Sequence, residues 1–343
     1  MSDLAWESLG QQAVAGAGVV YFLALLAHLV EWSSLRKVPV GSRAERRSVA
    51  AQAGDGGSAV AVLPDTETAD NADRIALFAR IGLSLTVLAA GLHFVALVSR
   101  GLAADPNRVP WGNMYEFTLS GTFFVTVIYL AMYRRFRLSW LGPVVTGFVV
   151  ALLMVAVIWL YAPVSPLREA LNSPWLVIHV ISAVIATGAF TVGAFVSALY
   201  LVKERSRHPE AGYVARLPEL AALDRIAYRL HAFAFPVWTF AVLITGPIWA
   251  HQAWSSYWNW DPKEVWAFIT WVVYAGYLHA RATAGWKGRK AAWLAIAGLA
   301  TLWFNFIGIN YFSTTSMHSY AAPATHQAGD PAVTHQAAPK QVA

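Results

Sequence analysis

The sequence predicts an all-α, polytopic membrane protein with about eight transmembrane helices. Of its 343 residues, 57% are hydrophobic and only 13% are charged, whereas soluble domains have about 25% charged residues. Apolar runs of about 20 residues recur along the chain, and each is long enough to cross a bilayer as a helix. One large water-soluble domain is therefore excluded as the main architecture.

The predicted spans follow these apolar runs in order, and polar or charged residues separate them. They cover residues 11–32, 75–99, 115–133, 140–162, 176–202, 230–250, 264–282 and 291–312. The first span is expected to be retained rather than cleaved as a signal. It is long, follows no basic segment and lacks a small-residue cleavage site.

Lys and Arg residues are distributed unevenly between the two sides of the predicted bundle. The loops after the odd-numbered spans, with the flanking Arg74 and Arg80, hold 20 of the 25 basic residues. This side is cytoplasmic by the positive-inside rule, so both termini are expected outside. We thus expect a multi-pass plasma membrane protein that works at its external face. The formal charge of +6 reflects topology, and no nucleic-acid partner is expected.

Four regions are expected along the chain. Residues 1–33 form an N-terminal transmembrane helix, and residues 74–320 form the main membrane domain. Residues 34–73, rich in Ala, Gly and Ser without an apolar period, predict a disordered cytoplasmic linker. Residues 321–343 are rich in Ala, Pro and Gln and predict a disordered external tail.

The most distinctive feature is the connection between the sixth and seventh spans, which we call the aromatic loop (residues 249–271, WAHQAWSSYWNWDPKEVWAFITW). Asp261 and Glu264 predict a capping box that starts the seventh span, with Pro262 at the first helical position. An interfacial belt explains some tryptophans. Five aromatic residues within thirteen positions favour instead a shelf for a large planar ligand. These five are Trp254, Tyr257, Trp258, Trp260 and Trp266.

Two histidines are expected at the outer side, beside this loop. His179 lies near the outer start of the fifth span, and His318 lies just beyond the eighth. Two imidazoles facing a planar ligand are typical of bis-histidine haem ligation. Each histidine alone is more often a hydrogen-bonded surface residue, so the pair carries the hypothesis.

His279 is predicted in the inner half of the seventh span, about 15 residues from its outer start and thus roughly 22 Å deep. An ionisable residue at that depth is a functional candidate. His28 and His231 are possible partners at similar depth, and His93 matches less well. Each of these three can equally be a helix-packing histidine.

The outer connection between the second and third spans holds a second polar group. Glu116 opens a helix, where a carboxylate suits the helix dipole. Asn113 is expected either as its cap or as a turn residue, and either residue can line the roof of the shelf.

Together these residues resemble a known family. The segment WNWDPKEVWAFITW resembles the tryptophan-rich "WWD" signature of haem-handling proteins in cytochrome c biogenesis. Tyr277-Leu278-His279 and the Pro110…Asn113…Glu116 pattern resemble its CcsA/ResC branch, called CcsB in some bacteria. Asn259 and Ser255 depart from the pattern, since glycine is common at both positions. The resemblance covers roughly residues 74–320.

The resemblance implies a "System II" cytochrome c biogenesis protein, a subunit of a holocytochrome c synthase (haem lyase). It implies haem b as substrate, an apocytochrome c with a CxxCH segment, and a CcsB/ResB-type membrane partner in the lipid bilayer. His179 and His318 would ligate an outer haem iron, and His279 an inner one. The remaining implied haem-binding residues are Trp254, Trp258, Trp260, Asp261, Trp266, Asn113 and Glu116.

Three other functions are considered. A haem exporter that delivers haem without attaching it fits the same histidines. A quinone- or haem-based redox carrier would need two stacked bis-histidine pairs, and at most one inner pair is available. A structural scaffold leaves the aromatic loop unexplained and is ranked last.

Overall fold

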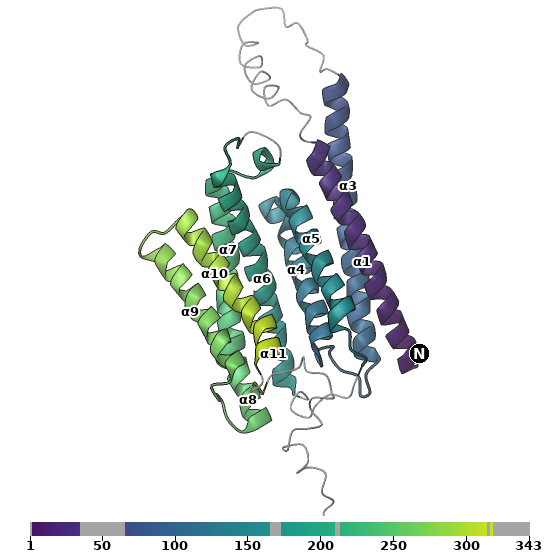
Figure 1. The fold of residues 1–343 in the computed structure, drawn as a ribbon, viewed down its shortest axis with the longest axis vertical. Coiled ribbons are helices and arrows are strands. Elements are labelled where there is room, and N and C mark those ends of the chain that lie inside the picture. The colour runs from purple at the N-terminus through teal and green to yellow at the C-terminus, as the bar shows by residue number, and fades with distance from the viewer. Residues whose placement is uncertain (1, 35–65, 165–172, 210–212, 314–315, 318–343) are drawn as a thin grey trace, which may run out of the picture.

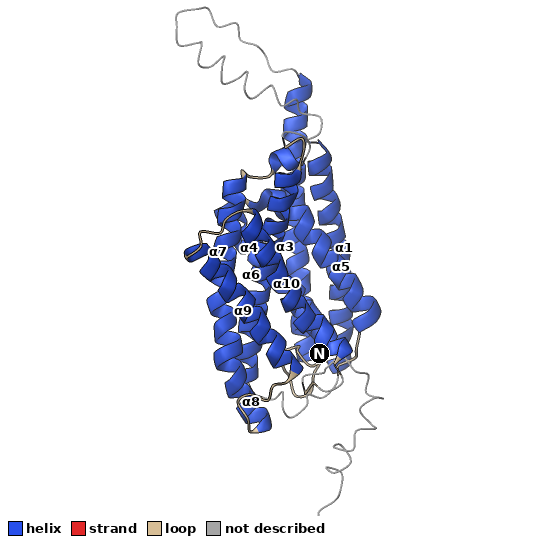
Figure 2. Ribbon diagram, turned by 60° about the vertical axis from the view of Figure 1, so that its left-hand side comes forward, coloured by secondary structure: helices blue, strands red, loops and turns tan. Residues whose placement is uncertain are grey.

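The computed structural model describes residues 2–34, 66–164, 173–209, 213–313 and 316–317. The described chain is helical and contains no strand, which confirms the predicted all-α class (Figure 1, Figure 2). The tail at 321–343 and residues 35–65 of the expected linker lie outside the described part. Residues 66–73, which were expected to belong to the disordered linker, are helical instead: they form the first turns of a helix that begins at Thr66 and is longer than the predicted second span.

Each predicted span corresponds to one helix or to one run of joined helices. The first half of the chain forms α1 (Asp3–Ser34), α3 (Thr66–Leu102), α4 (Met114–Phe136), the 3-10 helix η2 (Leu138–Leu141), and α5 (Gly142–Val155), which continues as the π-helix η3 (Ala156–Leu160). The second half begins with α6 (Pro174–Arg205) and the 3-10 helix η5 (Val214–Arg216). Next comes α7 (Leu220–Thr239), joined through the π-helix η6 (Phe240–Thr245) to α8 (Gly246–Trp254). The last elements are α9 (Pro262–Ala282), α10 (Arg289–Trp303), the π-helix η7 (Phe304–Gly308) and α11 (Ile309–Phe312).

Seven helices among the described residues are long and apolar enough to cross a membrane. The eighth predicted span is α9, which has 21 residues but is not one of the seven. Its aromatic and polar residues, among them Glu264, His279 and Arg281, lower its hydropathy. Because α9 runs alongside the other helices, we treat it as the eighth span (Figure 1).

The helices form one elongated bundle with α6 near its centre (Figure 1). On one side of α6 lie α4 and α5, with α1 packed along α3 beyond them. On the other side lie α7, α9 and α10. The N-terminus and the end of α11 lie at the same end of the bundle, as an even number of crossings requires.

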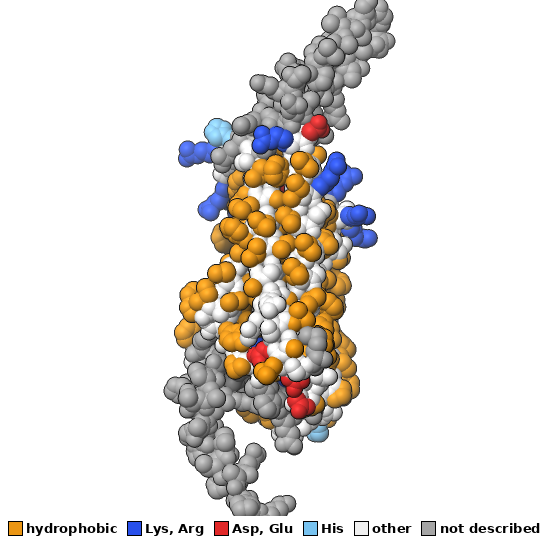
Figure 3. Space-filling model, turned by 90° about the vertical axis from the view of Figure 1, so that its right-hand side faces the viewer, with side chains coloured by type: hydrophobic (Ala, Val, Ile, Leu, Met, Phe, Trp, Pro, Cys, Tyr) orange, Lys and Arg blue, Asp and Glu red, His pale blue; other side chains and the backbone are white. Residues whose placement is uncertain are grey.

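The two ends of the bundle differ in chemistry. Lys and Arg side chains gather at the end where α3 begins, and orange apolar side chains cover most of the length between (Figure 3). We call this the basic end, and the opposite end, which holds the aromatic loop, the aromatic end. Many large apolar side chains are exposed along the bundle, including Val19, Leu88 and Trp159. Such a continuous apolar surface suits a lipid environment.

Local sequence signals explain the helix starts at the aromatic end. Asn113 caps α4 by accepting from the Glu116 backbone N–H at 3.0 Å, and Ser173 caps α6 just before Pro174. The capping box predicted for α9 is confirmed: Asp261 accepts from the Lys263 N–H at 2.9 Å, and Glu264 accepts from the Asp261 N–H at 3.1 Å.

Candidate functional site

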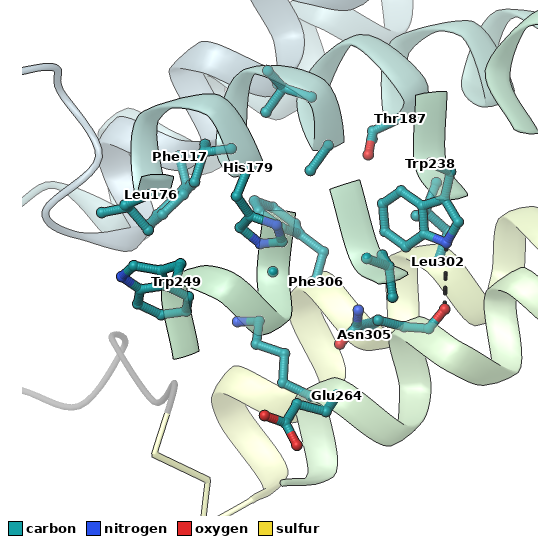
Figure 4. A pocket seen from close by; sticks show the side chains of 18 of the residues that line it. Phe117, Leu176, His179, Thr187, Trp238, Trp249, Glu264, Leu302, Asn305 and Phe306 are labelled. Carbon is teal, nitrogen blue, oxygen red and sulfur yellow. Dashed lines mark hydrogen bonds between the residues drawn. The ribbon is translucent and has the colours of Figure 1, made fainter. Parts of the chain in front are cut away.

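A cavity of about 190 Å³ lies at the aromatic end, among α4, α6, α8, α9 and η7 (Figure 4). Most of its wall is apolar, with Phe117, Leu176 and Phe306 among the lining residues. His179 and Trp249 lie on one side of it. Ligand sites are commonly apolar concavities that hold a few fixed polar groups. The cavity therefore has the general character of a site for an apolar ligand.

The His179 imidazole is held in a defined orientation on the cavity wall. Its Nδ1 donates to the Ala241 carbonyl at 2.9 Å, and its ring stacks on Trp249 with centroids 6.0 Å apart and planes 12° apart. A neutral imidazole with its proton on Nδ1 presents its lone pair at Nε2. Such a backbone contact is the usual way in which a protein orients a metal-ligating histidine.

The π-helix η6 makes this contact possible. Its wider turn pairs the Gly246 N–H with the Ala241 carbonyl, five residues earlier. The same carbonyl also accepts from Thr245 Oγ1 at 3.1 Å and from His179. A Cβ at Gly246 would lie 3.3 Å from the His179 ring and 3.1 Å from the Ala241 oxygen. Glycine thus allows α8 to approach the imidazole closely.

The aromatic loop contributes only part of its aromatic residues to the cavity. Trp249, Tyr257 and Trp258 line it. Trp254 packs against Trp249 at 4.8 Å, while Trp260 is 76% exposed and has a left-handed backbone (φ 54°). Trp266 does not line the cavity but packs on Phe304 of η7 at 4.2 Å. Of the five aromatic residues predicted to form the shelf, Tyr257 and Trp258 line the cavity, and ligand binding by the shelf stays a prediction.

Asp261 joins two parts of the chain that are distant in sequence. Besides capping α9, its carboxylate accepts from Ser316 Oγ at 2.9 Å and from the Met317 N–H at 2.6 Å. The side chain is buried, with 5% exposure. Asp261 thus fixes the chain immediately before His318, although His318 itself lies outside the described residues.

Glu116 and Asn113 do not line the cavity. Glu116 is fully buried and lies between two cations. Its carboxylate accepts from Arg100 Nη2 at 3.0 Å and from Arg108 Nη1 at 2.8 Å, and also from the Gly112 N–H at 2.7 Å. This ion cluster joins the end of α3 to the start of α4. Haem binding by Glu116 and Asn113 stays a prediction. In the structure, Asn113 caps α4, and Glu116 forms ion pairs with Arg100 and Arg108.

His279 is exposed on α9 and shares an outward face with Phe268 and Val272. His231 contacts the opposite, buried face of α9, where its ring lies 4.9 Å from that of Tyr277. Its Nδ1 donates to the Ala227 carbonyl. The structure does not bring His231 together with His279.

The other two candidate partners lie in the part of the bundle farther from α9. His28 of α1 is buried and lies 3.4 Å from Glu31, and α1 and α9 lie at opposite edges of the bundle (Figure 1). His93 of α3 is buried between Tyr21 and Phe123. None of the three candidate partners is therefore placed to share a ligand with His279.

Two polar residues of the cavity wall were not singled out from the sequence. Lys263 lines the cavity, and it is the one Lys or Arg in the aromatic loop. Asn305 of η7 is 7% exposed, and its Oδ1 has no hydrogen-bond partner within the described chain. A polar residue inside an apolar span was the available signal for Asn305. For Lys263, the available signal was that it is the one basic residue of the aromatic loop and lies within the capping box of α9.

Comparison with known proteins gives one consistent result. Residues 111–317 match the family model of the Cytochrome C assembly protein. "Cytochrome c biogenesis protein CcsA" of Guillardia theta is 32% identical over 264 residues, covering 70% of this chain and 85% of the relative. The CcsA of Gloeobacter violaceus is 33% identical over 305 residues, covering 71% and 89%.

A solved structure shares the fold. "Cytochrome c Heme Lyase CcmF" superposes with a TM-score of 0.58 at 16% identity and covers 89% of this chain. The match covers 47% of CcmF, so this chain spans about half the length of that protein. At this level of identity the likeness concerns the helical arrangement alone.

Proposed function

Since this chain belongs to the cytochrome c assembly protein family, as a CcsA-type protein of cytochrome c biogenesis, we propose that it holds haem b at the cavity beside His179 and presents it to apocytochrome c. The orientation of His179 carries the proposal. Its Nδ1 donates to the Ala241 carbonyl, and this kind of backbone contact orients the ring of a metal-ligating histidine. His318, which follows the segment fixed by Asp261, is the proposed second axial ligand.

The described residues fit a porphyrin in three respects. The wall is mainly apolar, as the macrocycle requires. Trp249, Tyr257 and Trp258 supply aromatic faces. Lys263 supplies a positive charge for a carboxylate of the ligand.

The reaction needs no cysteine from this chain, and the sequence contains none. Each attachment adds the S–H group of a substrate cysteine across a vinyl group of haem. A C–S bond forms, the S–H bond breaks, and the hydrogen goes to the second vinyl carbon, so the addition transfers no net electrons. The role of the chain is to position the reactants, which raises their effective concentration.

The outward face of α9 is the proposed contact with a CcsB/ResB-type subunit. His279, Phe268 and Val272 are all exposed there. A histidine facing lipid is costly unless it has a partner. We infer that the partner subunit covers this face and supplies the second ligand of an inner haem.

The aromatic end is proposed to face the outside of the plasma membrane. The argument is the positive-inside rule, because 20 of the 25 basic residues belong to the opposite side. Haem would then enter from the basic end and be attached at the aromatic end.

Replacing Lys263 with glutamine is expected to weaken haem binding on the order of tenfold, the effect of losing one charge-assisted hydrogen bond. Haem titration of the purified protein, followed by absorption, measures this change. K263R keeps the positive charge and is expected to retain most of the affinity. Equal affinities for K263Q and the parent protein would show that the cation does not contact the ligand.

The proposed function is tested by covalent attachment. The chain is expressed with a CcsB-type subunit and an apocytochrome c in a host that lacks its own maturation system. Haem should be found covalently bound to the apocytochrome, and changing both CxxCH cysteines to serine should abolish it. Haem that loads and reaches the outer face but is never attached would identify an exporter. Failure of haem to co-purify would contradict both functions.

A further inference from the structure

A second cavity, at the basic end, is lined by four arginines. It lies between the end of α4 and the first turns of α7 and measures about 230 Å³. Arg135 and Arg137 come from the first element, and Arg225 and Arg229 from the second. All four side chains are exposed, and within the described chain none of them forms an ion pair.

Four positive charges around one cavity repel one another. Guanidinium groups do not lose their charge at physiological pH, so an anion bound between them lowers this repulsion. The nearest acidic residue along α7 is Asp224, and it is already engaged by both guanidinium nitrogens of Arg281 at 2.7 and 2.9 Å. The cluster therefore has the charge of an anion-binding site that the described residues do not neutralise.

The backbone at Arg137 supports the same interpretation. Arg137 ends α4 in the left-handed conformation (φ 52°), and its N–H donates to the Tyr133 carbonyl. Glycine is the common residue at such a helix end, because a Cβ disfavours this conformation. An arginine at this position therefore has a backbone cost that glycine would not have.

The position of the cavity indicates which anion it takes. Arg135 and Arg137 directly follow the apolar span of α4, and Arg229 directly precedes the apolar part of α7. Phe136 and Ile226 also line the cavity, and the Arg229 guanidinium lies 5.9 Å from the Phe136 ring centroid. The site thus combines cations with apolar groups at the depth of lipid headgroups. Basic pockets of this kind, between helices, bind anionic lipid headgroups.

We propose that this cavity binds the phosphate headgroup of an anionic phospholipid. The arginines hold the phosphate by charge-assisted hydrogen bonds, and the acyl chains extend along the apolar surface of α4 and α7. The lipid fastens the two helices together at the basic end. The proposal does not depend on the haem site, which lies at the other end of the bundle.

Native mass spectrometry of the full-length protein tests the proposal directly. Phosphatidylglycerol and phosphatidylcholine with identical acyl chains are compared, with inorganic phosphate as a third probe. Phosphatidylglycerol is expected to bind on the order of tenfold more tightly than phosphatidylcholine. The double variant R225Q/R229Q is expected to remove this preference. The matched control R134Q/R207Q loses the same charge from exposed arginines outside the cavity and should keep it.

Arg137→Gly separates binding from folding. Glycine suits the left-handed backbone, so the unfolding midpoint without lipid should stay the same or rise. Phosphatidylglycerol binding should nevertheless weaken. Equal binding of the two lipids, or an equal loss in R134Q/R207Q, would overturn the proposal. If inorganic phosphate stabilises the protein as much as phosphatidylglycerol does, the site takes a free anion and the lipid assignment is wrong.

Discussion

Replacing His179 with glycine is expected to eliminate haem binding at the aromatic end and, with it, cytochrome c maturation. Loss of a group that merely orients a metal ligand typically costs about 10–100-fold in metal affinity, so loss of the ligand itself should cost at least as much. The reduced absorption spectrum of the purified protein, with its α and Soret bands, measures the effect. Covalent haem on a reporter apocytochrome measures the consequence.

Two further measurements distinguish ligation from a structural role. Added imidazole should enter the space left in H179G and restore the spectrum. H251G is the matched control: His251 belongs to the aromatic loop near His179 and stacks on Tyr257 at 4.3 Å, but it does not line the cavity. H251G should keep its haem. An unchanged spectrum in H179G would show that the iron is held elsewhere.

Replacing Glu116 with alanine is expected to cost the protein several kcal/mol of stability. The carboxylate is 0% exposed and is shared by Arg100, 1% exposed, and Arg108. Removing one partner of a buried ion pair costs about 3–5 kcal/mol, because the remaining charge stays buried without compensation. Here two guanidinium groups lose the same carboxylate. The unfolding midpoint in detergent, followed by circular dichroism, measures the loss.

Glu7 provides the control for this prediction. It also approaches Arg100, but at 3.7 Å and with 23% of its side chain exposed. Glu7→Ala is therefore expected to cost no more than about 1 kcal/mol. Equal unfolding midpoints for E116A and E7A would show that the ion cluster is not the main interaction between α3 and α4.

Much of the fold could be predicted from the sequence because the membrane imposes simple requirements. A span needs about 20 apolar residues, and all eight predicted spans correspond to helices. The α9 capping box could also be predicted, since Asp261, Pro262 and Glu264 are close together in the sequence and their interactions are local. The length of α3 could not, because its first turns at residues 66–73 are polar and extend the helix beyond the apolar run.

The candidate site could be predicted less completely from the sequence, because the contacts that orient its residues join segments that are far apart in the chain. His179 was expected beside the aromatic loop, but the Ala241 carbonyl that orients it lies 62 residues away in a π-helix. Sequence periodicity assumes regular α-helical turns, so it does not show such a segment. Glu116 illustrates the same difficulty: a first-turn carboxylate suggests a helix dipole contact, whereas the buried Arg100 and Arg108 engage it instead.

The π-helix η6 also determines which side chains of α8 face the cavity. An α-helix turns by about 100° per residue, and a π-helical turn accommodates one residue more than an α-turn. If residues Phe240–Thr245 formed regular α-helical turns instead, the same sequence would therefore continue from α7 into α8 with α8 rotated by about 100° about its axis. Trp249 would then leave the face that stacks on His179. The angular phase between the side chains of α7 and those of α8 therefore depends on the π-helical winding between them as well as on the number of residues.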